Sequence, residues 1–364
     1  MKAREQGAGP REAAFASRDI TLDFARMGPW SRQANAIIAF FNANIQAMDK
    51  MAREFKANPV KMAGRVTALV TIPSILLTLH NRQDPRWKDI PDWQKNAFWI
   101  IPTEKHLYRI PKPFDLGILF GSIPERIVEW IADREPTTGE AIKQALGNLD
   151  PDYMPTALNP WVEVYANRSR FTKRPIVPES KKDLPAALQS GKYTSRSMRE
   201  LGKTLGYSPA KLEHLWRGYT GGLGQYGLDV GDVVLEKMAP ENEPVEPAEA
   251  WSDKPIGRAF VVREPEASSK RVDDFYKMAE ESERLYAARK QLKLGEDKRK
   301  IYRAHRIIAI YKRRLSIYRK RAERIEQSKS LIADQKREQL DAIYRQMAEI
   351  AGKANEALRS NDAD

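Results

Sequence analysis

The feature that most constrains the fold is a regular spacing of apolar residues near the C-terminus. Eight of them follow one another at alternating steps of three and four residues, which places them on one stripe of an α-helix: Ile301, Ala304, Ile308, Tyr311, Leu315, Tyr318, Ala322 and Ile325. A second series repeats this spacing: Leu340, Ile343, Met347, Ile350, Ala354 and Ala357. A helical hairpin or coiled coil is therefore predicted over 270–364, and its first seam consists of Ile301, Ile308, Tyr311, Leu315, Tyr318 and Ile325.

The first of these helices is strongly basic. Between 298 and 324 there is one acidic residue, Glu323, against twelve basic residues: Lys298, Arg299, Lys300, Arg303, Arg306, Lys312, Arg313, Arg314, Arg319, Lys320, Arg321 and Arg324. The whole chain has a formal net charge of +13, so its surface favours acidic partners. Like charges at this density repel one another on an isolated helix. We expect them to bind nucleic-acid phosphate or an acidic face of a partner protein, and a solvated face without a partner is the third alternative.

A second basic segment, 190–224, contains two short predicted helices at 195–205 and 209–218. Gly206, Tyr207 and Ser208 join them, and Pro209 suits the first position of the second helix. This arrangement is compatible with a helix-turn-helix DNA reader. An ordinary helical hairpin is favoured, because Leu212, Leu215 and Trp216 occupy much of the supposed recognition face. The region supports the alternative function, a DNA-binding regulatory or packaging protein.

An uncharged run at 66–79 is apolar enough to be compared with a membrane span. Its fourteen residues would form a helix of about 21 Å, shorter than the roughly 30 Å hydrocarbon core of a bilayer. Pro73 predicts a kink or a helix end within the run. The sequence favours a buried core helix, and entry into a membrane is the alternative.

The remaining sequence divides the chain into four predicted regions. Residues 1–30 form an N-terminal lead-in, and 31–238 a mostly helical domain. Within that domain the proline-rich stretch 82–180 holds a small β-hairpin at 97–102 and 107–110. Residues 239–269 form a proline-rich acidic linker before the helical hairpin at 270–364. The predicted fold class is mainly α.

Catalytic chemistry has little support in the sequence. Cysteine is absent, and the four histidines are isolated from one another, without the spacing of a metal site. No nucleophile or phosphate-binding motif is present. We expect a protein that is not an enzyme and that carries no cofactor or metal.

Several segments resemble the large polyvalent protein-associated domains of bacteriophage and prophage proteins. The segments with this resemblance are ASRDITLDFARMG (16–28), FFNANIQAMDK (40–50), the stretch from IPSILLTLHN to DWQKNAFWIIP (72–102), YRIPKPFDLGILFGSIPERIVEWI (108–131), MPTALNPWVEVYANRSRFTKRPIVPE (154–179) and the helical stretch 190–224. Together they extend over about 16–230, and the basic hairpin lies outside them.

The resemblance implies a setting more than a mechanism. Proteins of this kind are thought to be packaged in the virion and to enter the host with the DNA. By this resemblance the chain would be a non-catalytic internal virion, or ejection, protein. It would lie in the capsid interior near the portal and later in the host cell. Its expected partners are portal or internal virion proteins and packaged DNA, with homo-oligomer formation and transient membrane contact during genome ejection.

Overall fold

The computed structural model describes Gly9 and residues 41–133, 138–147, 157–178, 181–191, 194–238, 244–254, 257–262, 269–288 and 297–363. Contacts between residues divide the chain into two compact units that alternate along the sequence. Unit 1 consists of Met1–Ile75, Lys112–Ile176 and Ala210–Gly224. Unit 2 consists of Leu76–Pro111, Val177–Pro209 and Gln225–Asp364. The predicted lead-in at 1–30 lies outside the described residues, apart from Gly9.

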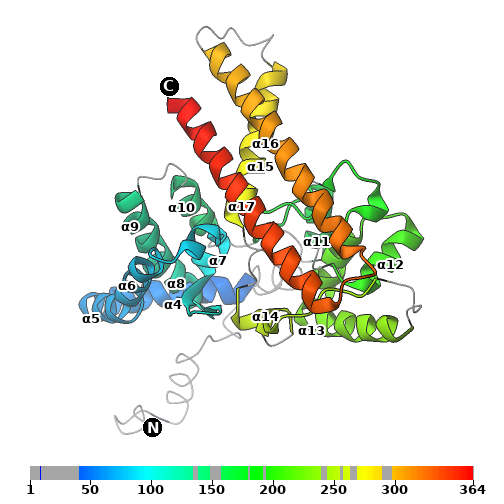
Figure 1. Ribbon diagram of the computed structural model, residues 1–364. Helices are drawn as coiled ribbons and strands as arrows, with labels where there is room; N and C mark the ends of the chain where they lie inside the picture. The colour runs from blue at the N-terminus through cyan, green and yellow to red at the C-terminus, as the bar shows by residue number, and fades with distance from the viewer. Residues whose placement is uncertain are drawn as a thin grey trace. The chain divides into compact units, whose positions relative to one another are not determined.

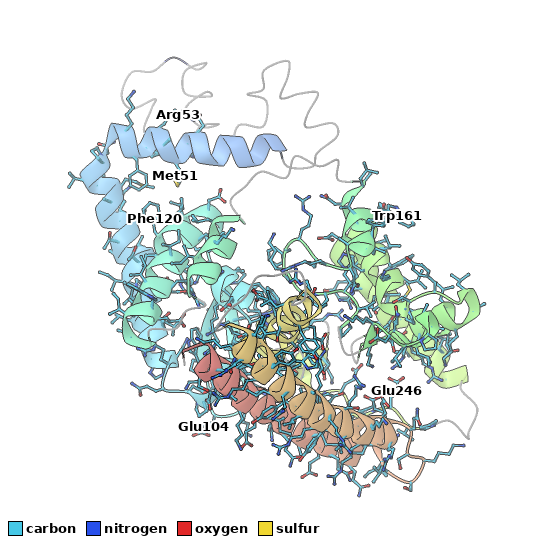
Figure 2. All side chains as sticks on the ribbon, turned by 90° about the horizontal axis from the view of Figure 1, so that it is seen from above. Met51, Arg53, Glu104, Phe120, Trp161 and Glu246 are labelled. Carbon is cyan, nitrogen blue, oxygen red and sulfur yellow. The ribbon has the colours of Figure 1, made fainter. Side chains whose placement is uncertain are left out.

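Unit 1 is built from short helices. They are α4 (Phe41–Ala57), α5 (Pro59–Val66), α8 (Phe114–Gly117), α9 (Ile123–Asp133), α10 (Thr138–Gly147) and α11 (Asn159–Tyr165). A single π-helical turn, η3 (Ile118–Ser122), joins α8 to α9. Phe120 of this turn, labelled in Figure 2, stacks on Phe55 of α4, and their ring centroids are 5.5 Å apart. Aromatic stacking of this kind attaches α4 to the α8–α9 helix.

The apolar run lies in one continuous helix, Pro59–Asn81. After α5 come a π-helical turn, η1 (Thr67–Thr71), and then α6 (Ile72–Asn81). The predicted helix end at Pro73 is wrong, because the chain stays helical through it. The other possibility, a kink at Pro73, stays a prediction. The Ile72 amide donates to the Thr67 carbonyl, which widens the turn just before the proline. The preferred core helix is also wrong: only 22% of the most apolar eighteen-residue window is buried.

The β-hairpin of unit 2 is confirmed. Strand β1 (Phe98–Pro102) pairs antiparallel with β2 (Leu107–Pro111), with Phe98 opposite Pro111. Around it lie the 3₁₀ turn η2 (Pro85–Asp89), α7 (Asp92–Ala97) and α14 (Gly257–Phe260). Unit 2 also contains α12 (Arg196–Leu205), which packs against the 3₁₀ turn at Ala186–Leu188. The hairpin core contains Trp87, Ile90, Ile100, Leu107 and Val262.

Three long helices end the chain: α15 (Lys270–Ala288), α16 (Asp297–Glu326) and α17 (Ala333–Ala363). They pack side by side in Figure 1. Helices α16 and α17 form the predicted helical hairpin, and α15 packs against both. The mainly α fold class is confirmed.

Helix α13 (Pro209–Met238) is longer than the predicted 209–218. Its backbone leaves helical geometry at Gly221, where φ is +59°. Glycine adopts this left-handed region without a side-chain clash, so the chain can turn there and resume the helix. The first part of α13 belongs to unit 1 and the last part to unit 2.

The predicted linker holds ordered contacts in its described part. The Lys336 ammonium donates to the carbonyls of Val245 and Glu326, at 2.7 and 2.8 Å. Arg337 pairs with Asp253 at 2.6 Å. Residues 244–254 are therefore attached to the start of α17. The domain boundaries drawn from the sequence stay a prediction.

Candidate nucleic-acid interface

The predicted seam of α16 faces the interior of the helical bundle. Ile308 and Leu315 are almost fully buried, in a core with Phe275 of α15 and Ala351 and Ala354 of α17. Ile301 and Ile325 are also buried, and Tyr311 and Tyr318 are half-buried against the same cores. Contacts within one chain thus cover the apolar side of α16, and this fixes which side of the helix faces outward.

Most of the predicted basic residues lie on the outward side of α16. We call the exposed ones the basic face: Lys298, Arg299, Arg303, Arg306, Arg313, Arg314, Lys320, Arg321 and Arg324. Lys300, Lys312 and Arg319 are half-buried and lie outside it. Four members of the face, at 299, 306, 313 and 320, recur every seven residues, about 10.5 Å along the helix axis. The face extends along about 39 Å of helix from 298 to 324.

Few acidic side chains neutralise this face. Half-buried Lys312 pairs with Glu283 of α15 at 2.6 Å. Within the described part of the chain, seven of the nine members have no ion-pair partner: Lys298, Arg299, Arg306, Arg313, Lys320, Arg321 and Arg324. Arg314 lies over the Tyr311 ring, 5.4 Å from its centroid. The face therefore presents uncompensated positive charge to solvent.

The chemistry of this face suits phosphate. Arginine donates hydrogen bonds in a planar fork that matches phosphate oxygens, and a row of such groups can follow a nucleic-acid backbone. The large apolar residues Tyr302, Ile310 and Ile317 are exposed between them. Contacts to phosphate carry no sequence information, so binding through them would be insensitive to sequence.

The alternative DNA-reading segment is organised differently from the prediction. Helix α12 begins as expected, with the Ser195 side chain accepting from the Met198 amide. Its basic side chains, however, face acidic neighbours: Arg199 pairs with Glu246, labelled in Figure 2, and Lys203 with Glu200. On α13, Arg217 pairs with Glu213. The charge available for phosphate is therefore smaller here than on α16.

The histidines are dispersed. His214 Nε2 lies 2.6 Å from a Glu163 carboxylate oxygen, and the His305 ring stacks on Tyr286. His80 borders a shallow pocket of about 450 Å³ that Asp84, Arg86 and Glu104 also line. Over the described ranges there is no cluster of three or more metal-binding side chains. The expectation of a non-catalytic chain remains an expectation.

One buried polar cluster of unit 1 has no signal in the sequence. The Lys112 ammonium donates to Ser122 at 3.0 Å and to Glu125 at 2.5 Å. Burial lowers the pKa of Lys112 to about 8 and raises the pKa of Glu125, while the attraction between the two opposes both shifts. Lys112 lies between two prolines, and no local pattern indicates that Glu125 will meet it.

Comparison with known proteins gives one match. Residues 84–256 match the family model of large polyvalent protein associated domain 38. No curated protein and no solved structure matches the chain. The matched residues include the resembling segments from 84 to 230 and extend to 256, while the bundle helices α15 to α17 lie outside them, as expected from the sequence. The match over 84–256 confirms the resemblance to the large polyvalent protein-associated domains of phage and prophage proteins.

Proposed function

We propose that this chain is a non-catalytic internal virion protein of a bacteriophage, packaged near the portal and the DNA, and that it takes part in genome delivery into the host. In this proposal α16 binds the phosphate backbone of packaged DNA. The observation that carries it is the basic face, where seven side chains lack an acidic partner within the described residues. The domain match supports the phage setting.

Helix α16 suits this role because its two sides are separated. The buried side holds the bundle together through Ile308 and Leu315, so DNA can occupy the other side without competing with folding. Homo-oligomer formation and contact with portal or internal virion proteins remain part of the proposal. They would use surfaces other than the seam, which the chain itself covers.

The decisive experiment is the salt dependence of binding to duplex DNA of random sequence. Each phosphate that a basic residue neutralises contributes about 0.9 to the slope of log affinity against log salt. Replacing Arg313, Arg314, Lys320 and Arg321 with Gln should make the slope less steep, by up to the contribution of about four phosphate contacts. The bundle should stay folded because these side chains are exposed.

A matched control removes the same charge elsewhere. Arg53, Lys203, Arg217 and Lys353 each pair with an acidic residue three or four positions away on their own helix. Changing these four to Gln lowers the net charge equally and should leave the salt slope nearly unchanged. If both variants flatten the slope equally, net charge alone explains binding. An unchanged slope in the α16 variant would assign the basic face to an acidic protein partner.

The location is tested separately. A mass-spectrometric inventory of purified phage particles should contain peptides from 41–363. If cells that express the chain produce particles without it, packaging is contradicted. This holds whatever the outcome of the DNA measurement.

A further inference from the structure

The helix Pro59–Asn81 has its polar and apolar sides reversed with respect to water. Its buried residues are spaced three or four apart, so they form one stripe: Val66, Val70, Ser74, Thr78 and Asn81. Three of these five are polar. A helix on the surface of a water-soluble domain normally buries its apolar side and exposes its polar side. Here burial selects the polar side.

The outward side is apolar. Leu69, Ile72, Leu76 and Leu79 are exposed by 71%, 48%, 61% and 42% respectively. We call these four residues the apolar face. They alternate steps of three and four residues, and this places them on one side of the helix. Leaving four large aliphatic side chains in water on one face is unfavourable, so an apolar environment that covers the face would stabilise the protein.

The polar stripe has partners inside the protein. Gly121 of η3 lies so close to the helix that a Cβ there would come within 2.9 Å of Ser74 Oγ and 3.4 Å of Val70. The Asn81 side-chain amide donates to the Ile100 carbonyl at 2.6 Å. Small residues and hydrogen bonds at the contact, with aliphatic side chains pointing outward, are features of helices that pack within a membrane.

Length, composition and charge favour lipid as the covering environment. The helix has 23 residues, about 35 Å, and a mean hydropathy of 1.6 in its most apolar window. From 55 to 83 the sequence has no acidic residue, whereas Lys56, Lys61, Arg65 and Arg82 flank the uncharged run. Basic residues at the ends of an apolar helix extend toward anionic lipid head groups.

We propose that the apolar face of this helix inserts into an anionic lipid bilayer. The inference adds a second partner to the proposed function and does not depend on DNA binding, since the basic face lies on a different helix. The π-helical turn η1 is compatible with insertion, because it keeps the backbone helical on approach to Pro73.

The test is flotation of the full-length chain with vesicles. Vesicles of phosphatidylglycerol and phosphatidylcholine should carry the protein upward in a density gradient. Leu69→Asn and Leu76→Asn together should lower the partition coefficient by about tenfold or more for each leucine. The control Leu205→Asn with Leu223→Asn changes leucines exposed by 59% and 81% on other helices, and it should float like the wild type.

A second measurement does not depend on loss of binding. Leu69→Trp keeps the face apolar, and its fluorescence should shift to the blue and be quenched by brominated lipid. Both Asn variants should keep the wild-type salt slope for DNA, so failure of this inference is distinguishable from failure of the proposed function. Three results would overturn the proposal. The wild type does not float, the Leu69→Asn, Leu76→Asn variant floats as well as the Leu205→Asn, Leu223→Asn control, or brominated lipid does not quench the fluorescence of the Leu69→Trp variant. So would a wild-type dimer in solution that Leu69→Asn and Leu76→Asn dissociate.

Discussion

Asp274 is a residue whose charge opposes folding. Burial in α15 raises the pKa of its carboxyl from 3.8 to about 6. Lys270 lowers this pKa, whereas the neighbouring carboxylates of Asp92 and Asp273 raise it further. The folded state therefore binds the proton more tightly than the unfolded chain does. The contribution of Asp274 to the free energy of unfolding therefore falls as the pH rises from about 4 to about 6. Above that range the destabilisation is complete.

Replacing Asp274 with Asn should stabilise the protein at pH 7.5 by about 1 kcal/mol or more, because the amide carries no charge to desolvate. The stabilisation should shrink at pH 4, where Asp274 is protonated in the folded state. Urea denaturation at the two pH values measures both effects. Glu338→Gln on exposed α17 surface is the control and should show no such pH-dependent gain. Equal effects of Asp274→Asn at both pH values would contradict this assignment.

Burial of single polar residues is the part of the structure that the sequence predicts least well. Asn81 is buried because it meets the Ile100 carbonyl, and Lys112 because it meets Glu125. These partners lie 19 and 13 residues away. Patterns based on helix periodicity treat such residues as surface, since they consider only neighbours on the same helix. For the same reason, the uncharged run at 66–79 indicates a core helix when it is considered alone. Its sequence does not show that the polar side of the helix has partners inside the protein.

Among the elements, helices with regular apolar spacing could be predicted. The seam of α16 depends only on steps of three and four residues, which the backbone geometry converts directly into a stripe. The association of α15 with the hairpin could not be predicted from the same pattern. It depends on contacts such as the ion pair of Lys312 of α16 with Glu283 of α15 and the hydrogen bond from Asn355 of α17 to the Arg271 carbonyl.

The seam of α16 is testable as an element. Ile308→Asp with Leu315→Asp places two charges among Phe275, Ala351 and Ala354, and each buried charge without a partner costs several kcal/mol. We expect loss of the bundle, seen as reduced far-UV circular dichroism and a lower Tm.

The control for this element lies on the same helix. Ile310→Asp with Ile317→Asp introduces the same charges at residues that are 48% and 60% exposed. These changes should leave the dichroism nearly unchanged. A bundle that tolerates both pairs equally would mean that Ile308 and Leu315 do not hold it together.

At the scale of the whole molecule, the segment 84–256 that matches the family model does not contain the whole core of the β-hairpin. The match ends at 256, yet Val262 belongs to the hairpin core and its amide donates to the Leu107 carbonyl at 2.8 Å. Arg109 donates to the carbonyls of Arg258 and Ala259, at 2.5 and 3.1 Å. Residues 257–262 therefore complete a structure whose other parts lie within 84–111.

A pair of shortened chains tests this dependence. Ending the chain at 256 removes Val262 and both carbonyl partners of Arg109, so the amides of β1 and β2 should exchange hydrogen much faster than in a chain that ends at 262. Both forms lack the three C-terminal helices, and the difference between them isolates six residues. Loss of the Val262 side chain alone should cost about 2 kcal/mol or more. Equal protection of β1 and β2 in the two chains would mean that the segment ending at 256 folds without them.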